Sequence, residues 1–175
     1  MVIQICGLVA MLFSVVSFQM NTHKKIMRMQ MSANLLFAIQ YLAMGAYSGA
    51  AMHGIGLMRG IVFYNSDKKW AKGKVWIISF VLMFIIFGVI TFDLPISILP
   101  PLAMVLNTFS FASTNPQFTR RTILISSPMW LVYSVVTGSI GGAINECFVM
   151  CSSILGIFRY RNKKVIEDRI NIEIN

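Results

Sequence analysis

Residues 31–64, MSANLLFAIQYLAMGAYSGAAMHGIGLMRGIVFY, decide the fold, because these 34 residues contain a single charged side chain, Arg59. A helix that crosses a bilayer needs about 20 mainly apolar residues. The stretch is too long for one crossing, so it must fold back on itself. The glycines within residues 45–49 permit a tight reversal. We therefore predict two membrane-spanning helices here, over about residues 30–46 and 50–64.

The rest of the chain repeats this pattern. Residues 2–20, 75–92 and 96–112 are apolar stretches of single-span length. Residues 122–158 contain one charge, Glu146, and are again long enough to fold back, with a turn in residues 137–142. Only 12% of the chain is charged, against about 25% in soluble domains. Buried soluble helices or β-branched core strands are the alternatives, but seven such segments with so little charge favour an all-α polytopic membrane protein.

The positive charges support seven spans. The net charge is +9, and 14 of the 15 Lys and Arg residues lie in residues 21–29, 65–74, 113–121 and the tail from 159 onward. With seven spans all four segments share one side of the membrane, whereas six spans would mix them. The positive-inside rule then places the N-terminus outside and the C-terminus inside. A nucleic-acid partner is not expected, because long apolar stretches separate the basic segments.

The two hairpin turns resemble each other at an offset of 93 residues. Residues 45–53 and 138–146 both read G-x-x-x-G-A-x-x followed by an ionisable residue, His53 or Glu146. This predicts 3+1+3 parallel repeats about an axis along the membrane normal. The expected units are a first three-helix repeat at 1–64, a basic loop and linker helix at 65–95, a second three-helix repeat at 96–159, and a cytoplasmic tail at 160–175.

This arrangement resembles the PQ-loop/SWEET (MtN3-like) superfamily, whose naming motif is similar to Asn115-Pro116-Gln117. More closely, residues 2–160 resemble the YgjV family of bacterial inner-membrane proteins. The motifs that carry this resemblance are Ser17-Phe18-Gln19, Gly45-Ala46, Gly49-Ala50, Arg59, Leu99-Pro100, Trp130-Leu131-Val132-Tyr133, Gly138-Ser139, Glu146 and Gly156-x-x-Arg159.

The resemblance implies a PQ-loop-like bundle in the bacterial inner (plasma) membrane that moves a small polar solute through a midplane site between the repeats. Gln19, Pro116 and Gln117 occupy the positions expected of hinges. The first unit departs from the pattern, since Phe18 stands where a PQ motif has proline. That departure puts a symmetric transport cycle in doubt. The alternative is a non-transporting receptor, or an interaction or structural subunit, of the same fold.

Ionisable and polar residues within spans are expensive and indicate function by default. Arg59 and Glu146 have similar expected depths, which predicts an ion pair that either fixes helix docking or serves binding or gating. His53 would either titrate beside Glu146 in a cavity or bond to a neighbouring carbonyl. The candidate substrate-binding or gating residues are Asn34, Gln40, Tyr41, His53, Arg59, Asn107, Trp130, Tyr133, Asn145 and Glu146. Each amide could equally be a hydrogen-bonding contact between helices.

No catalytic constellation is present in the sequence, so an enzyme is not expected. It also lacks a Gly-rich phosphate loop and paired carboxylates, and its two histidines are too few for an intramembrane metal site. We expect no metal and no cofactor. The expected partners are the lipid bilayer, a small polar solute and possible further copies of the chain in a homo-oligomer.

Overall fold

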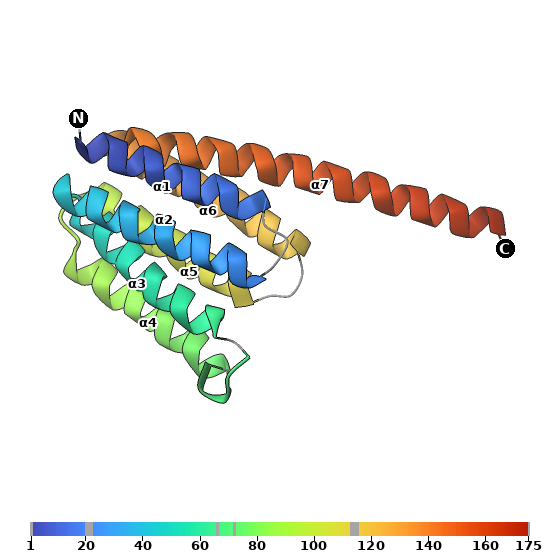
Figure 1. The fold of residues 1–175 in the computed structure, drawn as a ribbon, viewed down its shortest axis with the longest axis horizontal. Coiled ribbons are helices and arrows are strands. Elements are labelled where there is room, and N and C mark those ends of the chain that lie inside the picture. Colours follow the sequence, from blue (N-terminus) through green and yellow to red (C-terminus); the bar gives the residue numbers. More distant parts are fainter. Residues whose placement is uncertain (1, 20–22, 66, 72, 113–115, 175) are drawn as a thin grey trace.

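The structure is a computed structural model that describes residues 2–19, 23–65, 67–71, 73–112 and 116–174, with backbone alone described at 2, 18, 19, 23, 26, 111, 112, 116, 117, 119 and 159–174. Within these residues the chain forms seven α-helices and no strand, as the sequence predicts (Figure 1). The elements are α1 (Val2–Gln19), α2 (His23–Ala43), α3 (Tyr47–Tyr64), the 3-10 turn η1 (Lys69–Ala71), α4 (Lys74–Ile90), the 3-10 turn η2 (Pro95–Ile98), α5 (Leu99–Ala112), α6 (Pro116–Val136) and α7 (Ile140–Ile174).

Two helices begin earlier than predicted. α2 begins at His23 rather than near residue 30, and α6 begins at Pro116 rather than near residue 122. Their first two turns therefore contain the basic residues that the sequence assigned to loops. A helix satisfies its own backbone hydrogen bonds and long basic side chains can reach water from its end. Lys24 and Lys25 are accordingly exposed.

The two predicted reversals are confirmed, each within a few residues of its expected place. Gly45 and Gly138 adopt φ values of 73° and 74°, the left-handed region that glycine enters without steric penalty. Equivalent backbone bonds close both turns, from Ala46 N to Tyr41 O at 2.9 Å and from Ser139 N to Ser134 O at 2.8 Å. Each turn joins two antiparallel helices, α2 to α3 and α6 to α7.

Six of the helices form a closed ring. Going around it, α1 packs against α2, α2 against α3, α3 against α5, α5 against α6, α6 against α7, and α7 against α1. α4 stands outside this ring and packs against α3 and α5 (Figure 1). The ring therefore encloses the interior of the bundle without any contribution from α4.

Helix boundaries also recur at an offset of 93 residues. α2 and α6 each contain 21 residues and begin 93 positions apart, as do the starts of α3 and α7. α1 covers the same relative positions as η2 and α5 together. The second of these segments is divided into two elements because it contains Pro95, Pro100 and Pro101. Proline cannot donate the backbone hydrogen bonds that a continuous helix requires. α1 contains no proline and is unbroken.

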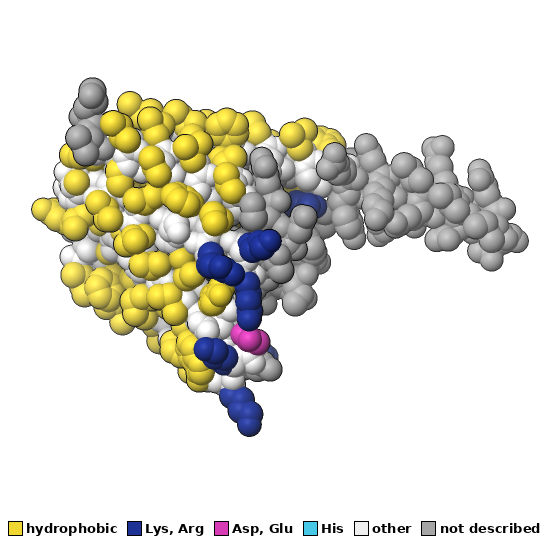
Figure 2. Space-filling model, in the orientation of Figure 1, with side chains coloured by type: hydrophobic (Ala, Val, Ile, Leu, Met, Phe, Trp, Pro, Cys, Tyr) yellow, Lys and Arg dark blue, Asp and Glu magenta, His cyan; other side chains and the backbone are white. Residues whose placement is uncertain are grey.

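The helices differ in how well each would cross a bilayer by itself. Within the described residues, only Ile140–Phe158 of α7 is both long and apolar enough, while Ile3–Ser17, Lys74–Ile90 and Pro95–Ser110 are shorter apolar helices. α2, α3 and α6 fall outside this group because they carry polar side chains within the bundle and, in α2 and α6, basic residues near their starts. Large apolar side chains cover the outer surface, and the exposed basic residues gather near one end (Figure 2).

Candidate functional site

A cavity of about 210 Å³ lies inside the ring. It is lined from α1, α2, α3, α5, α6 and α7, and no residue of α4 reaches it. The lining residues are Ser14, Met27, Gln30, Ala33, Asn34, Phe37, His53, Gly56, Arg59, Gly60, Phe63, Met104, Asn107, Ile123, Ser126, Ser127, Trp130, Asn145, Glu146 and Val149. This volume is far above the roughly 10–15 Å³ that one water molecule needs.

The lining is arranged in pairs across the cavity. Fourteen of its twenty residues form seven pairs separated by 93 positions. The pairs are Ser14 with Asn107, Gln30 with Ile123, Ala33 with Ser126, Asn34 with Ser127, Phe37 with Trp130, His53 with Glu146, and Gly56 with Val149. Equivalent helix faces therefore point toward one interior. The equivalent helices are α1 and α5, α2 and α6, and α3 and α7.

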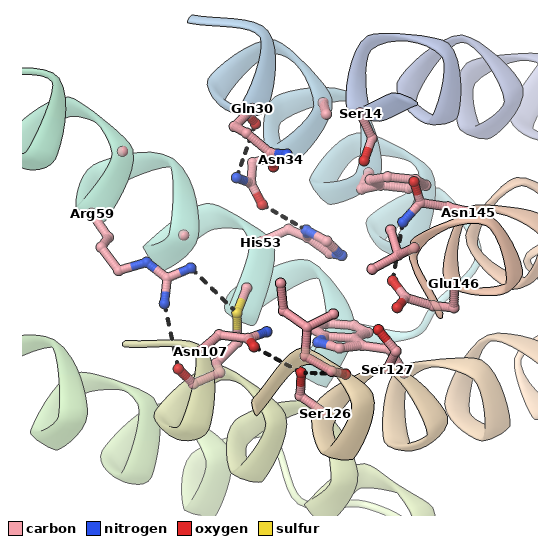
Figure 3. A pocket seen from close by; sticks show the side chains of 18 of the residues that line it. Ser14, Gln30, Asn34, His53, Arg59, Asn107, Ser126, Ser127, Asn145 and Glu146 are labelled. Carbon is pink, nitrogen blue, oxygen red and sulfur yellow. Dashed lines mark hydrogen bonds between the residues drawn. The ribbon is translucent and has the colours of Figure 1, made fainter. Parts of the chain in front are cut away.

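Three short polar contacts hold side chains at the cavity wall (Figure 3). His53 Nδ1 lies 2.9 Å from Asn34 Oδ1, and Ser126 donates to Asn107 Oδ1 at 2.7 Å. Asn145 Nδ2 donates to Glu146 Oε1 at 3.0 Å. The partner of His53 is thus a neighbouring carbonyl oxygen, as one of the two sequence-based alternatives expects, and it belongs to a side-chain amide.

Aromatic rings form one side of the cavity. The His53 ring lies 5.1 Å from the Phe37 ring and 4.7 Å from the Trp130 ring, measured between centroids. Phe37 comes from α2, His53 from α3 and Trp130 from α6. The rings provide a flat apolar surface, and the amides and hydroxyls beside them provide hydrogen-bonding groups. Such a mixture is typical of small-molecule sites.

The ion pair predicted between Arg59 and Glu146 does not form between these two described side chains. Arg59 Nη1 donates to Thr108 Oγ1 at 2.8 Å, and the guanidinium lies 5.4 Å from the centroid of the Phe84 ring. Glu146 instead accepts from Asn145 Nδ2. Arg59 is directed toward α5 and α4, which is why it does not reach across to α7. Both residues still line the same cavity.

Gln40, Tyr41 and Tyr133, which the sequence assigned to the site, lie one turn beyond it toward the hairpin turns. Tyr41 and Ser134 share a hydrogen bond of 2.7 Å, and Gly49 N donates to the Tyr133 hydroxyl at 2.9 Å. Ser139 donates to Gln40 Oε1 at 3.1 Å. All three predicted residues are almost fully buried. Together with Ser134 they form what we term the closing layer, which joins α2 to α6 and to the turn before α7, and joins α3 to α6.

The other predicted residues fall into two groups. Asn34, His53, Arg59, Asn107, Trp130, Asn145 and Glu146 all line the cavity. For the expected hinges, Gln19 ends α1 and Pro116 and Gln117 begin α6, but their side chains lie outside the described part of the structure.

Sequence reasoning missed several small polar residues of the lining. Ser14, Gln30, Ser126 and Ser127 line the cavity without having been singled out. The offset of 93 contains the signal that finds two of them, because it relates Ser14 to Asn107 and Ser127 to Asn34. Among the described residues, no three His, Cys, Asp or Glu side chains come together as a metal site.

Comparison with known proteins gives two results. The model of a family named Imp-YgjV and described as bacterial inner membrane protein matches residues 1–164. "Inner membrane protein YgjV" of Escherichia coli (strain K12) is 20% identical over 155 residues, which cover 88% of this chain and 81% of that protein. No solved structure matches the chain significantly.

Proposed function

The chain belongs to the Imp-YgjV family of bacterial inner membrane proteins, and from that premise we propose that it is a transporter or facilitator of a small polar solute. The cavity inside the ring is the proposed solute site. The observation that carries the proposal is that polar residues from six helices surround this cavity in a membrane protein. Polar groups in a membrane interior are costly and usually mark a pathway for a solute or an ion.

The proposal includes two parallel three-helix units, α1–α3 and α5–α7, joined by α4, in a PQ-loop-like bundle. The recurring helix boundaries, the matching φ angles of Gly45 and Gly138, and the seven lining pairs support this relation. The packing agrees with it, because α1 contacts α7 just as α5 contacts α3. An odd linker helix gives the two units the same orientation in the membrane.

We propose that the N-terminus faces outward and the C-terminus faces the cytoplasm. The exposed basic residues gather at the end of the bundle where α1 meets α2, α3 meets α4, and α5 meets α6 (Figures 1 and 2). Cytoplasmic loops carry the excess of Lys and Arg. In this orientation the closing layer faces outward, and the cavity lies on its cytoplasmic side.

Transport then requires the closing layer to open and the opposite side to close. Its bonds are few. They join α2 to α6 and to the turn before α7, and they join α3 to α6. A hydrogen bond between membrane helices contributes about 0.6–2 kcal/mol. Contacts of this size can be broken and reformed during a transport cycle.

Uptake of a pooled set of labelled metabolites into proteoliposomes tests the proposal. Ser126→Trp would fill the cavity, because Ser126 is buried and lines it. We expect this variant to lose the uptake that the wild type supports. Val132→Trp is the matched control, since Val132 lies on the same helix and is exposed on the outer surface.

Two outcomes contradict transport through the cavity. One is that no solute enters wild-type vesicles faster than protein-free vesicles. The other is that Ser126→Trp and Val132→Trp support equal uptake. Binding of a solute without any uptake would instead favour the non-transporting receptor of the same fold.

A further inference from the structure

We infer that the cavity takes a small primary amine as its ammonium ion, and that this group lies between His53 Nε2 on α3 and the Glu146 carboxylate on α7. The inference rests on the proposed function, because it names the class of solute for the same cavity. Both residues line that cavity, and they occupy equivalent positions 93 residues apart. They therefore face the same interior from the two different groups of three helices.

A chain of two hydrogen bonds fixes which nitrogen of the His53 ring carries a proton. Asn34 Nδ2 donates to the Gln30 carbonyl at 2.9 Å, and because a carbonyl only accepts, the other end of the amide, its oxygen, is left for His53. That oxygen lies 2.9 Å from His53 Nδ1, so Nδ1 is the donor. In the neutral ring, Nε2 is then left as a hydrogen-bond acceptor.

His53 Nε2 is open to the cavity. It has no hydrogen-bond partner among the described residues, and it is not one of their enclosed, unpaired polar atoms. An unpaired atom that is not enclosed has surface that a ligand can reach. In Figure 3 the ring nitrogen that is turned away from Asn34 points toward the side of the cavity where Glu146 lies.

Glu146 presents a second acceptor to the same space. It is partly exposed although it lies inside the ring, and Asn145 Nδ2 donates to its Oε1 atom at 3.0 Å. Within the described part of the chain it forms no ion pair, so a gap separates its carboxylate from His53. An ionised carboxylate inside a membrane is costly unless a positive group lies close to it. A cationic ligand in the gap offsets that cost.

The chemistry of the ligand follows from these two acceptors. Neither can donate to the other, so the donors must come from the ligand. An ammonium group has three N–H donors and a positive charge, and it can therefore donate to His53 Nε2 and to the Glu146 carboxylate. A hydroxyl has one donor and no charge, and a quaternary ammonium ion has the charge but no donor. The site therefore favours a primary amine over both.

Arg59 lies toward the other end of the cavity from this site. It is six residues further along α3 than His53, or about 9 Å at a rise of 1.5 Å per residue. Its guanidinium donates to Thr108 Oγ1 and lies over the Phe84 ring. Figure 3 shows Arg59 and Glu146 on opposite sides of His53. The ammonium group is therefore placed at the Glu146 end, away from the guanidinium.

Binding to the purified protein in lipid nanodiscs tests this inference with three matched probes. The primary amine 3-aminopropan-1-ol carries the charge and the donors, its N,N,N-trimethyl derivative carries the charge without the donors, and propane-1,3-diol carries no charge. The wild type should bind the primary amine at least about tenfold more tightly than either analogue, since each analogue loses one part of the interaction. Equal binding of the amine and either analogue, or no binding of the amine, overturns the inference.

Two variants assign the two contacts. Glu146→Gln removes the charge and should abolish the preference for the amine over propane-1,3-diol. His53→Phe keeps a flat ring and removes Nε2, so it should weaken binding of the amine by about tenfold without weakening binding of the trimethyl derivative. Cys147→Ser and Met58→Leu are the controls, because both residues are exposed neighbours on the same helices. A variant that leaves its own preference unchanged overturns the inference.

NMR of the ¹⁵N-labelled histidine ring tests the acceptor without any ligand. The chain has two histidines, His23 and His53, so the His23→Gln protein gives the signals of His53 alone. The neutral ring should carry its proton on Nδ1. A neutral ring with its proton on Nε2 has no acceptor to offer the ammonium group, and that result overturns the inference. If Glu146→Gln or His53→Phe does not fold, this measurement and the three probes on the wild type still decide.

Proteoliposome uptake separates this inference from the proposed function. Uptake of some other solute, with no binding of 3-aminopropan-1-ol, overturns the amine site and leaves transport standing. Selective binding of 3-aminopropan-1-ol, with no uptake of any solute, supports the amine site and overturns transport. Competition of 3-aminopropan-1-ol with a transported solute supports both.

Discussion

The helices α1–α3 and α5–α7 have closely matching backbones but different interior side chains. Their hairpin turns use the same glycine conformation and the same backbone bonds. Within the cavity, however, the residues at equivalent positions differ. Phe37 in the first group corresponds to Trp130 in the second, and His53 corresponds to Glu146. A nearly symmetric scaffold therefore surrounds a chemically asymmetric cavity. In the proposed transporter, this asymmetry would present different chemistry to the two ends of a solute.

The position of α4 explains why α3 has a buried cation, Arg59, where α7 has none. Arg59 on α3 is buried, and Phe84 of α4 covers its guanidinium. The position 93 residues later is Ser152 on α7, which is exposed. α4 packs against α3 and α5, and α7 has no such cover. A cation could be buried on α3 only because the linking helix shields it from the outer surface.

The largest expected effect is at the two helix contacts that close the ring. α7 meets α1 where a Cβ on Gly141 would lie 2.3 Å from the carbonyl carbon of Gly7. Gly141→Ala should therefore separate these helices and lower the free energy of unfolding by about 1–3 kcal/mol. At the equivalent contact, Ser48 donates to Ser97 O at 2.9 Å. Ser48→Ala should cost less, about 0.5–1.5 kcal/mol.

Unfolding of the protein in detergent micelles measures this order. Gly54→Ala is the control, because a Cβ there meets no atom within 4 Å. That variant should be at least as stable as the wild type, since alanine is the better helix former. If Gly141→Ala behaves like Gly54→Ala, the α1–α7 contact is looser than the structure has it.

The next largest effect is expected where Phe84 of α4 shields Arg59. Phe84→Leu removes the ring and should lower the free energy of unfolding by about 1–2 kcal/mol, part of it from the lost cation–π contact. The cation–π part should disappear when Arg59 is already Met, which a double-mutant cycle measures. Ser152→Ala, at the equivalent exposed position, should change the same free energy by less than about 0.5 kcal/mol. A Phe84→Leu effect that is identical with and without Arg59 would contradict the shielding role of α4.

The sequence could predict the helices and turns because their signals are local. Gly45 and Gly138 mark the reversals, and the length of each apolar stretch limits the number of helices. Which side chains share a cavity depends on how the helices are rotated and packed. Tyr41 and Tyr133 were therefore assigned to the site although they lie in the closing layer one turn away.

The prediction of an Arg59–Glu146 ion pair is wrong for a related reason. Sequence gives the depth of each residue along its own helix at about 1.5 Å per residue, and the two depths were similar. It does not give the direction in which a side chain points. Arg59 reaches Thr108, a residue without any charge to indicate it as a partner. The position of α4 outside the ring, which makes this contact possible, has no local sequence signal.

The smallest expected changes in the free energy of unfolding are at two contacts near the basic end of the bundle. Lys24 on α2 and Asp67 in the loop after α3 form an ion pair at 3.2 Å with both side chains more than half exposed. In the second, Arg120 on α6 donates to the Gly156 carbonyl on α7 at 3.0 Å and is partly buried. Arg120→Gln should lower the free energy of unfolding by about 0.5–1.5 kcal/mol. Lys24→Gln should have a much smaller effect, because exposed ion pairs are screened by water and salt.

Acid distinguishes the two contacts further. The hydrogen bond from Lys24 lowers the pKa of the Asp67 carboxyl below its ordinary value. Because this pKa is lower in the folded state, any stability that the pair contributes is present above the ordinary Asp pKa of about 3.9 and is lost as the pH falls through the folded value. The difference between Lys24→Gln and the wild type should therefore vanish in acid, and that between Arg120→Gln and the wild type should persist, because a backbone carbonyl does not titrate. Unfolding curves at neutral and acidic pH measure both differences, and a Lys24→Gln effect that survives acidification would show that Lys24 acts through some other contact.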